Sequence, residues 1–344
     1  MDASPLRRAL IALANRQSLS DEQTAEAFGI VMSGEATPAQ IGGLLLGLRA
    51  KGETADELAG AARALRNAMI RVSATQPHLV DTCGTGGGTV PTFNISTVAA
   101  FVAAGAGAVV PKHGNRSYTS RCGSADVLEA LGIRIVLDAA SAGRVLNEAR
   151  VVFLFAPSFH PAMKHVGPVR RELGTPTLMN LVGPLANPAG VNRQVIGVAE
   201  ADRAAIVAEA LVRLGAEHAL VVHGRVGMDE ISPHGVTDVW EVKDDTVRTW
   251  EIDPERFRLG IKDVGELQGG EPAANAERLE RILGNGSADP AGLAAVLLNA
   301  GAAIYVAGIA NSLAEGIGRA REVVASGAAR AALDRLRKAT ASTS

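Results

Sequence analysis

The chain has 344 residues, of which 47% are hydrophobic, 20% are charged and 3% are aromatic, and its formal net charge is −2. A chain of this length can bury one large hydrophobic core or two smaller ones. The balanced charge and the scarcity of aromatic side chains argue against a nucleic-acid-binding protein, which needs a basic face and often stacks bases on aromatic rings.

Residues 1–72 predict four short helices and no strand. Each helix has its own start signal, which is a capping side chain followed by proline or by the second half of a capping box. The four signals are Ser4-Pro5, Ser20 with Gln23, Thr37-Pro38, and Thr54 with Glu57. Apolar residues recur at helical spacing between these signals. We therefore expect a small all-helical domain at residues 1–72.

Short apolar runs alternate with helical patterns from Pro77 onward. This alternation is typical of a parallel α/β sheet. The last third of the chain, from Asp289-Pro290, predicts helices. The candidate strands are residues 78–82, 108–110, 133–136, 151–155, 194–198 and 219–222, with an antiparallel pair at 236–242 and 247–252. The predicted fold class is α/β, with the helical domain followed by a larger α/β domain at residues 73–344 around a mainly parallel central sheet.

The most apolar late stretch, residues 294–310, is interrupted by Asn299. It is short for a membrane span of about 20 residues and predicts a buried helix. The first residues lack the long apolar run of a signal peptide. Cys83 and Cys122 lie far apart and form no CxxC pair, which disfavours a zinc or redox motif. These features favour a cytoplasmic protein.

Two candidate anion sites follow the first predicted strand of the sheet, where ligands of α/β proteins bind. Residues 84–89 read Gly-Thr-Gly-Gly-Gly-Thr, and their backbone N–H groups can hold phosphate oxygens. A flexible turn is an equally good interpretation of this loop. Residues 94–97, Asn-Ile-Ser-Thr, open a helix whose N-terminus attracts anions, although Ser and Thr are also ordinary caps there.

Charged side chains at three later places in the chain are further candidates for ligand binding. Residues 112–120 carry Lys112 and Arg116 among small hydroxyl side chains, which suits phosphate binding but also a solvated basic loop. Asp229-Glu230 supplies adjacent oxygen ligands for Mg²⁺, or a surface acidic pair. Arg170 lies on a predicted helix and could hold a carboxylate as a fork, or face solvent.

Five blocks of this sequence occur in an order that resembles the anthranilate phosphoribosyltransferases. The blocks are GTGG…TFNIST, KHGNR…S, FLFAPSFHPAMK…PVRREL, NLVGPLANPA and GMDEIS. The resemblance implies a nucleoside phosphorylase/phosphoribosyltransferase-like fold, with a segment at about residues 163–190 returning to the helical domain. It implies a homodimer and a reaction that joins anthranilate to 5-phosphoribosyl 1-diphosphate, with Mg²⁺ as cofactor.

The resemblance also implies roles for individual residues. Those expected to bind the phosphoribosyl diphosphate are Gly84, Gly87, Gly88, Thr92, Asn94, Ile95, Ser96, Thr97, Lys112, His113, Gly114, Asn115, Arg116 and Ser120. Those expected to bind anthranilate are Gly84, Asn115 and Arg170, and His113 and Pro157 would line its path. The expected Mg²⁺ ligands are Ser96, Asp229 and Glu230. We assign no catalytic base, because the amine of anthranilate is already neutral at pH 7 and needs positioning more than deprotonation.

One position departs from the family pattern. The family usually shows GTGGDG, whereas this chain has Gly88 and Thr89 at the last two positions. The resemblance thus implies that an anionic group near the diphosphate and the metal is missing. We expect Mg²⁺ use to persist through Asp229 and Glu230 at an altered optimum concentration.

Three other functions remain compatible with parts of this pattern. A pyrimidine nucleoside phosphorylase shares the architecture, but Asp229-Glu230 and Arg170 favour the transferase. A non-catalytic relative that binds nucleic acid would need a basic face, which the net charge of −2 disfavours. A sibling transferase with another aromatic or amine acceptor also remains open, because the lining of the pocket rather than the motifs sets the choice of acceptor.

Overall fold

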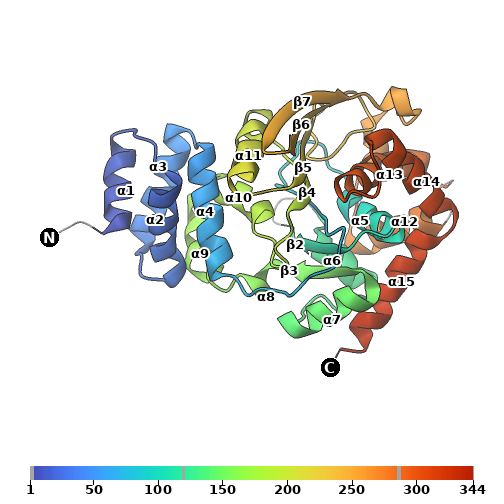
Figure 1. Ribbon diagram of the computed structural model, residues 1–344, viewed down its shortest axis with the longest axis horizontal. Helices are drawn as coiled ribbons and strands as arrows, with labels where there is room; N and C mark the ends of the chain where they lie inside the picture. The colour runs from blue at the N-terminus through green and yellow to red at the C-terminus, as the bar shows by residue number, and fades with distance from the viewer. Residues whose placement is uncertain (1–3, 118–120, 285–287, 344) are drawn as a thin grey trace.

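The computed structural model describes residues 4–117, 121–284 and 288–343. A helical bundle forms one end of the molecule, and a larger part with both helices and strands forms the other (Figure 1). This arrangement confirms the predicted fold class.

Four N-terminal helices form the bundle, as the start signals predict. They are α1 (Pro5–Ala14), α2 (Asp21–Ser33), α3 (Pro38–Lys51) and α4 (Ala55–Ala68). The hydroxyl of Ser4 accepts a hydrogen bond from the Arg7 backbone, and the other three helices begin with complete capping boxes. Local hydrogen bonding therefore fixes where each helix begins.

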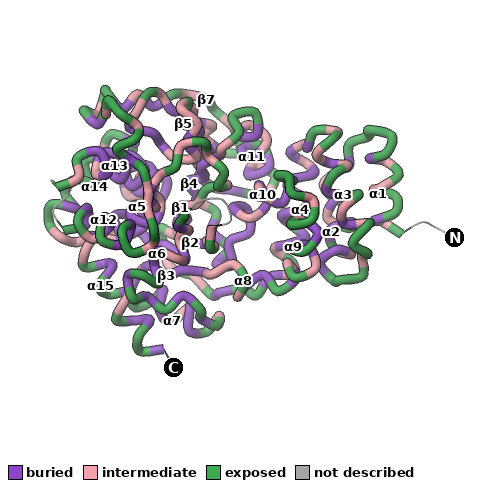
Figure 2. The backbone as a smooth tube through the Cα atoms, turned by 180° about the vertical axis from the view of Figure 1, so that it is seen from behind, coloured by how far each residue is buried: buried purple, intermediate pink, exposed green. Residues whose placement is uncertain are grey.

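Two later helices, α9 (Met163–Leu173) and α10 (Met179–Val182), pack against the bundle. Their buried residues Val166 and Leu181 belong to the same hydrophobic cluster as Leu44 and Leu58 of α3 and α4. This cluster continues onto α11 (Ala201–Arg213) and one face of the main sheet. Figure 2 shows the buried residues running through both ends of the molecule.

The strands form a five-stranded sheet in the order β1-β4-β5-β6-β7 and a two-stranded sheet of β2 and β3. β1, β4 and β5 are parallel, β2 is parallel to β3, and β6 and β7 are antiparallel. The predicted hairpin at β6 and β7 is confirmed, and its turn residues Asp244 and Asp245 have positive φ. The strands are β1 (Asp81–Gly84), β2 (Val110–Gly114), β3 (Val151–Phe155), β4 (Arg193–Gly197), β5 (His218–Gly224), β6 (Thr237–Lys243) and β7 (Thr246–Ile252).

Helices cover the sheets, and the buried helix predicted from the apolar stretch is α13 (Pro290–Val306), which packs against α5 (Ile95–Gly105) and α14 (Leu313–Ala325). The described residues contain no helix long and apolar enough to cross a membrane. The remaining α-helices are α6 (Ser124–Ala130), α7 (Ala139–Ala149), α8 (Ala156–Phe159), α12 (Pro272–Gly284) and α15 (Ala328–Ala341). Short 3₁₀ turns occupy Gly183–Leu185, Pro254–Phe257 and Val264–Leu267.

The strand predicted at residues 133–136 is wrong. Alternate residues of this segment are buried, with Ile133 and Ile135 inside and Val136 57% exposed, as the apolar pattern suggests. The segment nevertheless belongs to neither sheet. Burial of every second residue needs only an extended chain, whereas a strand also needs a hydrogen-bonding neighbour.

Candidate active site

The glycine turn, residues 84–89, follows β1 and rests on the loop after β5. Gly86 and Gly87 adopt φ values of 69° and 85°, which glycine reaches without strain. The Gly86 N–H donates to Asp229 Oδ2 at 2.9 Å, and the Thr89 N–H donates to the Gly227 carbonyl at 2.9 Å. One amide of the turn therefore bonds directly to the first residue of the acidic pair, Asp229 and Glu230.

The acidic pair lies against the N-terminus of α5. Glu230 Oε1 accepts a hydrogen bond from the Ser96 N–H at 3.1 Å. Burial, and after it the neighbouring Asp229, raises the pKa of Glu230 to about 8. Burial also raises the pKa of Asp229. Two adjacent, half-buried carboxylates of this kind favour a bound cation, which would relieve both the desolvation and their mutual repulsion.

Lys112 of β2 brings a cation to the same place. Its ammonium donates to the Thr82 carbonyl and to Ser96 Oγ, the latter at 3.2 Å. Burial lowers the pKa of Lys112, against the attraction of the buried Asp81. Asp81 is held in turn by the Asn187 side chain at 2.8 Å. The glycine turn, the α5 N-terminus, Lys112 and the acidic pair thus converge at the carboxyl ends of neighbouring strands.

A residue that the sequence analysis missed supports the acidic pair. Gly197 ends β4, and a Cβ atom there would lie 1.7 Å from the Asp229 carbonyl oxygen. Only glycine lets the acidic pair sit this close to the sheet. The signal in the sequence was weak, since a glycine within the predicted strand 194–198 indicates close backbone approach without naming its partner.

The ligand atoms available here fit Mg²⁺. Ser96, Asp229 and Glu230 offer only oxygen, which hard cations prefer. Within residues 4–117, 121–284 and 288–343, no group of three or more His, Cys, Asp or Glu side chains could hold a metal by itself. Two carboxylates and a hydroxyl leave room for phosphate and water, the usual coordination of Mg²⁺ in phosphate-binding enzymes.

Asn94 links the start of α5 to the segment before α6 and to α12. Its Nδ2 donates to the Cys122 carbonyl at 3.0 Å, and its Oδ1 accepts from Asn275 Nδ2 of α12 at 3.0 Å. Nearby, Thr92 forms an antiparallel bridge with Gln268. Ile95 and Thr97 are buried, so Ile95 can meet a ligand only through its backbone.

The segment after β2 places its polar residues in different directions. Gly114 is crowded, because a Cβ there would lie 2.4 Å from Ser124 Oγ. Asn115 Oδ1 accepts from the Arg116 N–H at 2.8 Å. The Arg116 guanidinium pairs with Asp126 and Glu129 of α6 and packs over the Phe155 ring, so its charge is already partnered by protein groups. Ser120 lies outside the described residues.

Two buried histidines meet beside β2. His113 Nε2 lies 3.2 Å from His160 Nε2, and Pro157 lies in the short helix α8 just before His160. Burial, followed by the charge of His160, lowers the pKa of His113 to about 3, and burial lowers that of His160 to about 4. Both rings are therefore neutral at pH 7 and weak as proton acceptors.

Arg170 lies on α9, in the part of the chain that packs on the helical bundle. Its Nη2 donates to Asn180 Oδ1 at 3.3 Å, and the Thr177 N–H donates to the same oxygen at 3.1 Å. Asn180 thus fixes the position of Arg170, the residue that the sequence analysis predicts to bind a carboxylate.

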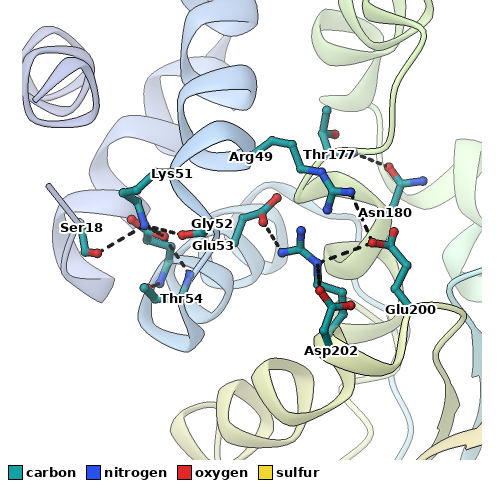
Figure 3. A network of polar contacts seen from close by, with 12 residues as sticks. Ser18, Arg49, Lys51, Gly52, Glu53, Thr54, Thr177, Asn180, Glu200 and Asp202 are labelled. Atoms are coloured by element: carbon teal, nitrogen blue, oxygen red, sulfur yellow. Dashed lines mark hydrogen bonds and ion pairs between the residues drawn. The ribbon is translucent and has the colours of Figure 1, made fainter. Parts of the chain in front are cut away.

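Ion pairs join the helical bundle to α11 close to Asn180 (Figure 3). Glu53, which precedes α4, pairs with Arg203 of α11, and both side chains are almost fully buried. Arg49 of α3 pairs with Glu200 at 3.3 Å. These contacts connect the two parts of the molecule directly, without passing through the main sheet.

Comparison with known proteins agrees with this geometry. Residues 76–330 match the a/b domain of a glycosyl transferase family, and residues 7–69 match the helical bundle domain of such a family. An anthranilate phosphoribosyltransferase of Laribacter hongkongensis is 48% identical over 331 residues, which cover 96% of each chain.

Two solved structures share the whole fold. The crystal structure of anthranilate phosphoribosyltransferase from Thermus thermophilus has a TM-score of 0.93 at 41% identity, covering 99% of this chain and all of that one. The Saccharomyces cerevisiae enzyme in complex with PRPP and Mg has a TM-score of 0.90 at 28% identity, covering 99% of each chain.

Proposed function

The chain belongs to the anthranilate phosphoribosyltransferase family, and we propose that it catalyses the reaction of that family at the site where the glycine turn, α5, Lys112 and the acidic pair converge. The reaction transfers the phosphoribosyl group of 5-phosphoribosyl 1-diphosphate to anthranilate, releases diphosphate, and serves tryptophan biosynthesis. Its cofactor is Mg²⁺. The observation that carries the proposed location is that each of the two half-buried carboxylates accepts a hydrogen bond from a backbone N–H group of one of the two anion sites.

We assign the diphosphate of the donor to the amides of the glycine turn and of the first turn of α5. N–H groups at a helix N-terminus and in a glycine turn are suited to phosphate oxygens. Those of Gly86 and Ser96 bond to the two carboxylates in this structure, and a bound Mg²⁺ would draw the carboxylates away from them. The ammonium of Lys112 donates a hydrogen bond to Ser96 Oγ and adds a positive charge to the site. Mg²⁺ held by Ser96, Asp229 and Glu230 would neutralise further charge on the diphosphate.

The reaction needs few groups from the protein beyond these. The lone pair of the anthranilate nitrogen forms the new bond to C1 of the ribose, the C1–O bond breaks, and the diphosphate leaves with the electron pair. The proton released from nitrogen passes to water. Preorganised N–H groups and Lys112 stabilise the departing negative charge. His113 and His160 are neutral and weakly basic, so we assign them to the lining of the acceptor path.

We assign the carboxylate of anthranilate to Arg170, with Asn115 and Gly84 beside the acceptor. A guanidinium matches a carboxylate with two parallel hydrogen bonds and so fixes the orientation of the ring. The Asn180 side chain supports this role by holding one Arg170 nitrogen in place.

We propose that residues 1–72 form one domain with the returning segment 163–190, and that residues 73–344 form the other. The packing of α9 and α10 on the bundle supports this division. We also propose a homodimer through the helical domains, because Ile11 of α1 and Leu46 of α3 are 53% and 42% exposed. We also propose a cytoplasmic location, which accords with a chain of 344 residues that contains only two cysteines, Cys83 and Cys122, far apart in the sequence.

The direct test is loss of anthranilate fluorescence in the presence of the purified protein, phosphoribosyl diphosphate and Mg²⁺. Fluorescence should fall only when all three are present. Arg170→Gln should raise the KM for anthranilate roughly 10- to 100-fold, the equivalent of a lost charged hydrogen bond, with little change in the KM for the donor. Arg171→Gln is the matched control on the exposed side of the same helix. Undiminished fluorescence with all components would refute the function, and equal effects of the two variants would refute the role of Arg170.

A further inference from the structure

A buried amide interrupts the most apolar helix of the α/β domain. Asn299 of α13 is 3% exposed and is surrounded along the helix by alanine, valine and leucine. Its Oδ1 accepts from the Ile231 N–H at 3.0 Å, and its Nδ2 donates to the Ile231 carbonyl at 2.9 Å. The same nitrogen donates to the Ala295 carbonyl at 2.9 Å. Both donors of the amide are therefore used.

This pairing holds the backbone at one defined point. The two bonds to Ile231 resemble the exchange of hydrogen bonds between paired strand residues, with a side chain taking the place of the second strand. Asparagine is a poor helix former, and a buried amide destabilises the fold unless it is hydrogen-bonded. An apolar residue would have a higher helix propensity and would bury no polar group. The role of Asn299 therefore lies in its hydrogen bonds to the backbone of Ile231.

Ile231 directly follows the acidic pair. It is fully buried and so cannot itself meet a ligand. The segment is fixed at both ends: the Gly224 N–H donates to the Met228 carbonyl at 2.9 Å, and the Ser232 N–H donates to Thr237 Oγ1 at 2.9 Å. Asn299 supplies the constraint nearest to Glu230 on its C-terminal side. The backbone is thus pinned around the two residues whose carboxylates point to the glycine turn and α5.

We infer that Asn299 is a positioning residue for the metal ligands Asp229 and Glu230, acting through the backbone of Ile231. The inference rests on the proposed assignment of Mg²⁺ to the acidic pair. Mg²⁺ demands near-ideal octahedral geometry at about 2.1 Å, so a small backbone shift at its ligands weakens binding. Residues that orient metal ligands typically contribute 10- to 100-fold to metal affinity.

The first experiment measures Mn²⁺ binding to the full chain by electron paramagnetic resonance, with phosphoribosyl diphosphate present and anthranilate absent. Mn²⁺ prefers the same oxygen ligands as Mg²⁺. Asn299→Leu preserves an apolar helix but removes the pairing with Ile231. It should weaken Mn²⁺ binding about 10- to 100-fold and raise the Mg²⁺ concentration for half-maximal activity in proportion. The KM for anthranilate should stay within about twofold, because a shift of the acidic pair leaves Arg170 in place.

Gln194→Met is the matched control for loss of a buried amide. Gln194 is 1% exposed and donates to the Pro184 carbonyl at 2.8 Å, away from the acidic pair. This variant should lower the melting temperature and leave Mn²⁺ binding unchanged. Equal Mn²⁺ binding by wild type and a folded Asn299→Leu protein would overturn the inference.

Asn299→Asp separates geometry from charge. It keeps the shape and the oxygen that accepts from the Ile231 N–H, but it loses the donor to the Ile231 carbonyl. A new carboxylate near a cation site strengthens cation binding by simple attraction. Weaker Mn²⁺ binding by this variant would therefore report lost geometry, whereas stronger binding would overturn the inference, as would failure of both Asn299 variants to fold.

The assignment of the metal itself is tested separately by the double variant Asp229→Asn, Glu230→Gln. If this protein binds Mn²⁺ like the wild type, the proposed metal site is wrong whatever Asn299 does. If it loses Mn²⁺ while the Asn299 variants retain it, only the positioning role fails.

Discussion

The donor side and the acceptor side of the proposed active site are built by different means. The donor side consists of backbone amides, glycines and half-buried carboxylates near strand ends, with Gly86 bonded to Asp229 and Ser96 bonded to Glu230. The acceptor side consists of side chains on helices, with Arg170 held by Asn180 and the helical bundle tied to α11 by ion pairs. Backbone geometry tolerates little change, whereas side chains can be exchanged. Donor recognition should therefore be rigid, and acceptor choice adjustable.

The sharpest test of the rigid donor side is Gly197→Ala. The added Cβ would lie 1.7 Å from the Asp229 carbonyl oxygen, so the acidic pair must move. We expect kcat/KM for the donor to fall by about 100-fold or more, since misplacement of about 1 Å has that effect. Gly318→Ala is the control, because a Cβ there meets nothing within 4 Å. If Gly197→Ala has the same kcat/KM for the donor as the wild type, the donor side is not rigid and the proposed difference between the two sides is wrong.

On the acceptor side, substitutions in the ion pairs between the helical bundle and α11 should instead lower the free energy of unfolding. Glu53→Gln leaves the Arg203 guanidinium buried without its nearest carboxylate, and we expect the free energy of unfolding to drop by about 3 kcal/mol. Asp56→Asn weakens the more exposed pair with Arg213 and should lower it by less than about 1 kcal/mol. Urea unfolding measures both. Equal losses would mean that the buried pair does not hold the two parts together.

Much of the fold followed from the sequence because the signals are local. The capping residues Ser20 and Thr54 bond to residues three positions away, and these contacts form in the same way in any surroundings. The convergence of the glycine turn, Lys112 and the acidic pair followed from a general rule, since parallel strands bring their carboxyl ends to one edge of the sheet.

The contacts that the sequence could not predict are long-range packing events. Asn299 pairs with Ile231 across 68 positions, and its sequence signal was only an interruption of an apolar helix. The closeness of Gly197 to Asp229 had only a weak signal, a glycine within a predicted strand, which does not identify the partner. The wrong strand at 133–136 has the same cause, because a pattern of buried residues does not reveal whether a partner strand lies beside it.

The histidine pair consists of His113 on β2 and His160 just after α8, and both side chains are buried. Their folded pKa values, about 3 and about 4, lie below the value of about 6.5 for free histidine. Between pH 6.5 and 4 the unfolded chain therefore binds protons that the folded chain does not, and stability is lost as pH falls. Each histidine contributes up to roughly 1.4 kcal/mol per pH unit in this window.

The check is the free energy of unfolding of wild type and His160→Asn between pH 7 and pH 5. The difference between the two proteins should change with pH by roughly 1 kcal/mol per unit below pH 6, with the wild type losing stability faster. Parallel curves would show that His160 is not held neutral by burial.

The smallest expected effect concerns the departure from the family pattern at Gly88. A Cβ at Gly88 would lie 2.9 Å from Asp229 Oδ1, so Gly88→Asp adds a third carboxylate beside the metal ligands. We expect the Mg²⁺ concentration for half-maximal activity to fall roughly three- to tenfold. Gly88→Asn has the same shape without the charge and should not lower it. A Mg²⁺ titration unchanged by Gly88→Asp would contradict our account of the altered optimum.

The most direct measurement is a crystal structure with phosphoribosyl diphosphate and Mn²⁺, with the metal located by its anomalous scattering. The account predicts a single strong peak about 2.2 Å from carboxylate oxygens of Asp229 and Glu230, with diphosphate oxygens on the amides of the glycine turn and α5. A metal bound elsewhere, or a diphosphate that leaves those amides empty, would contradict it.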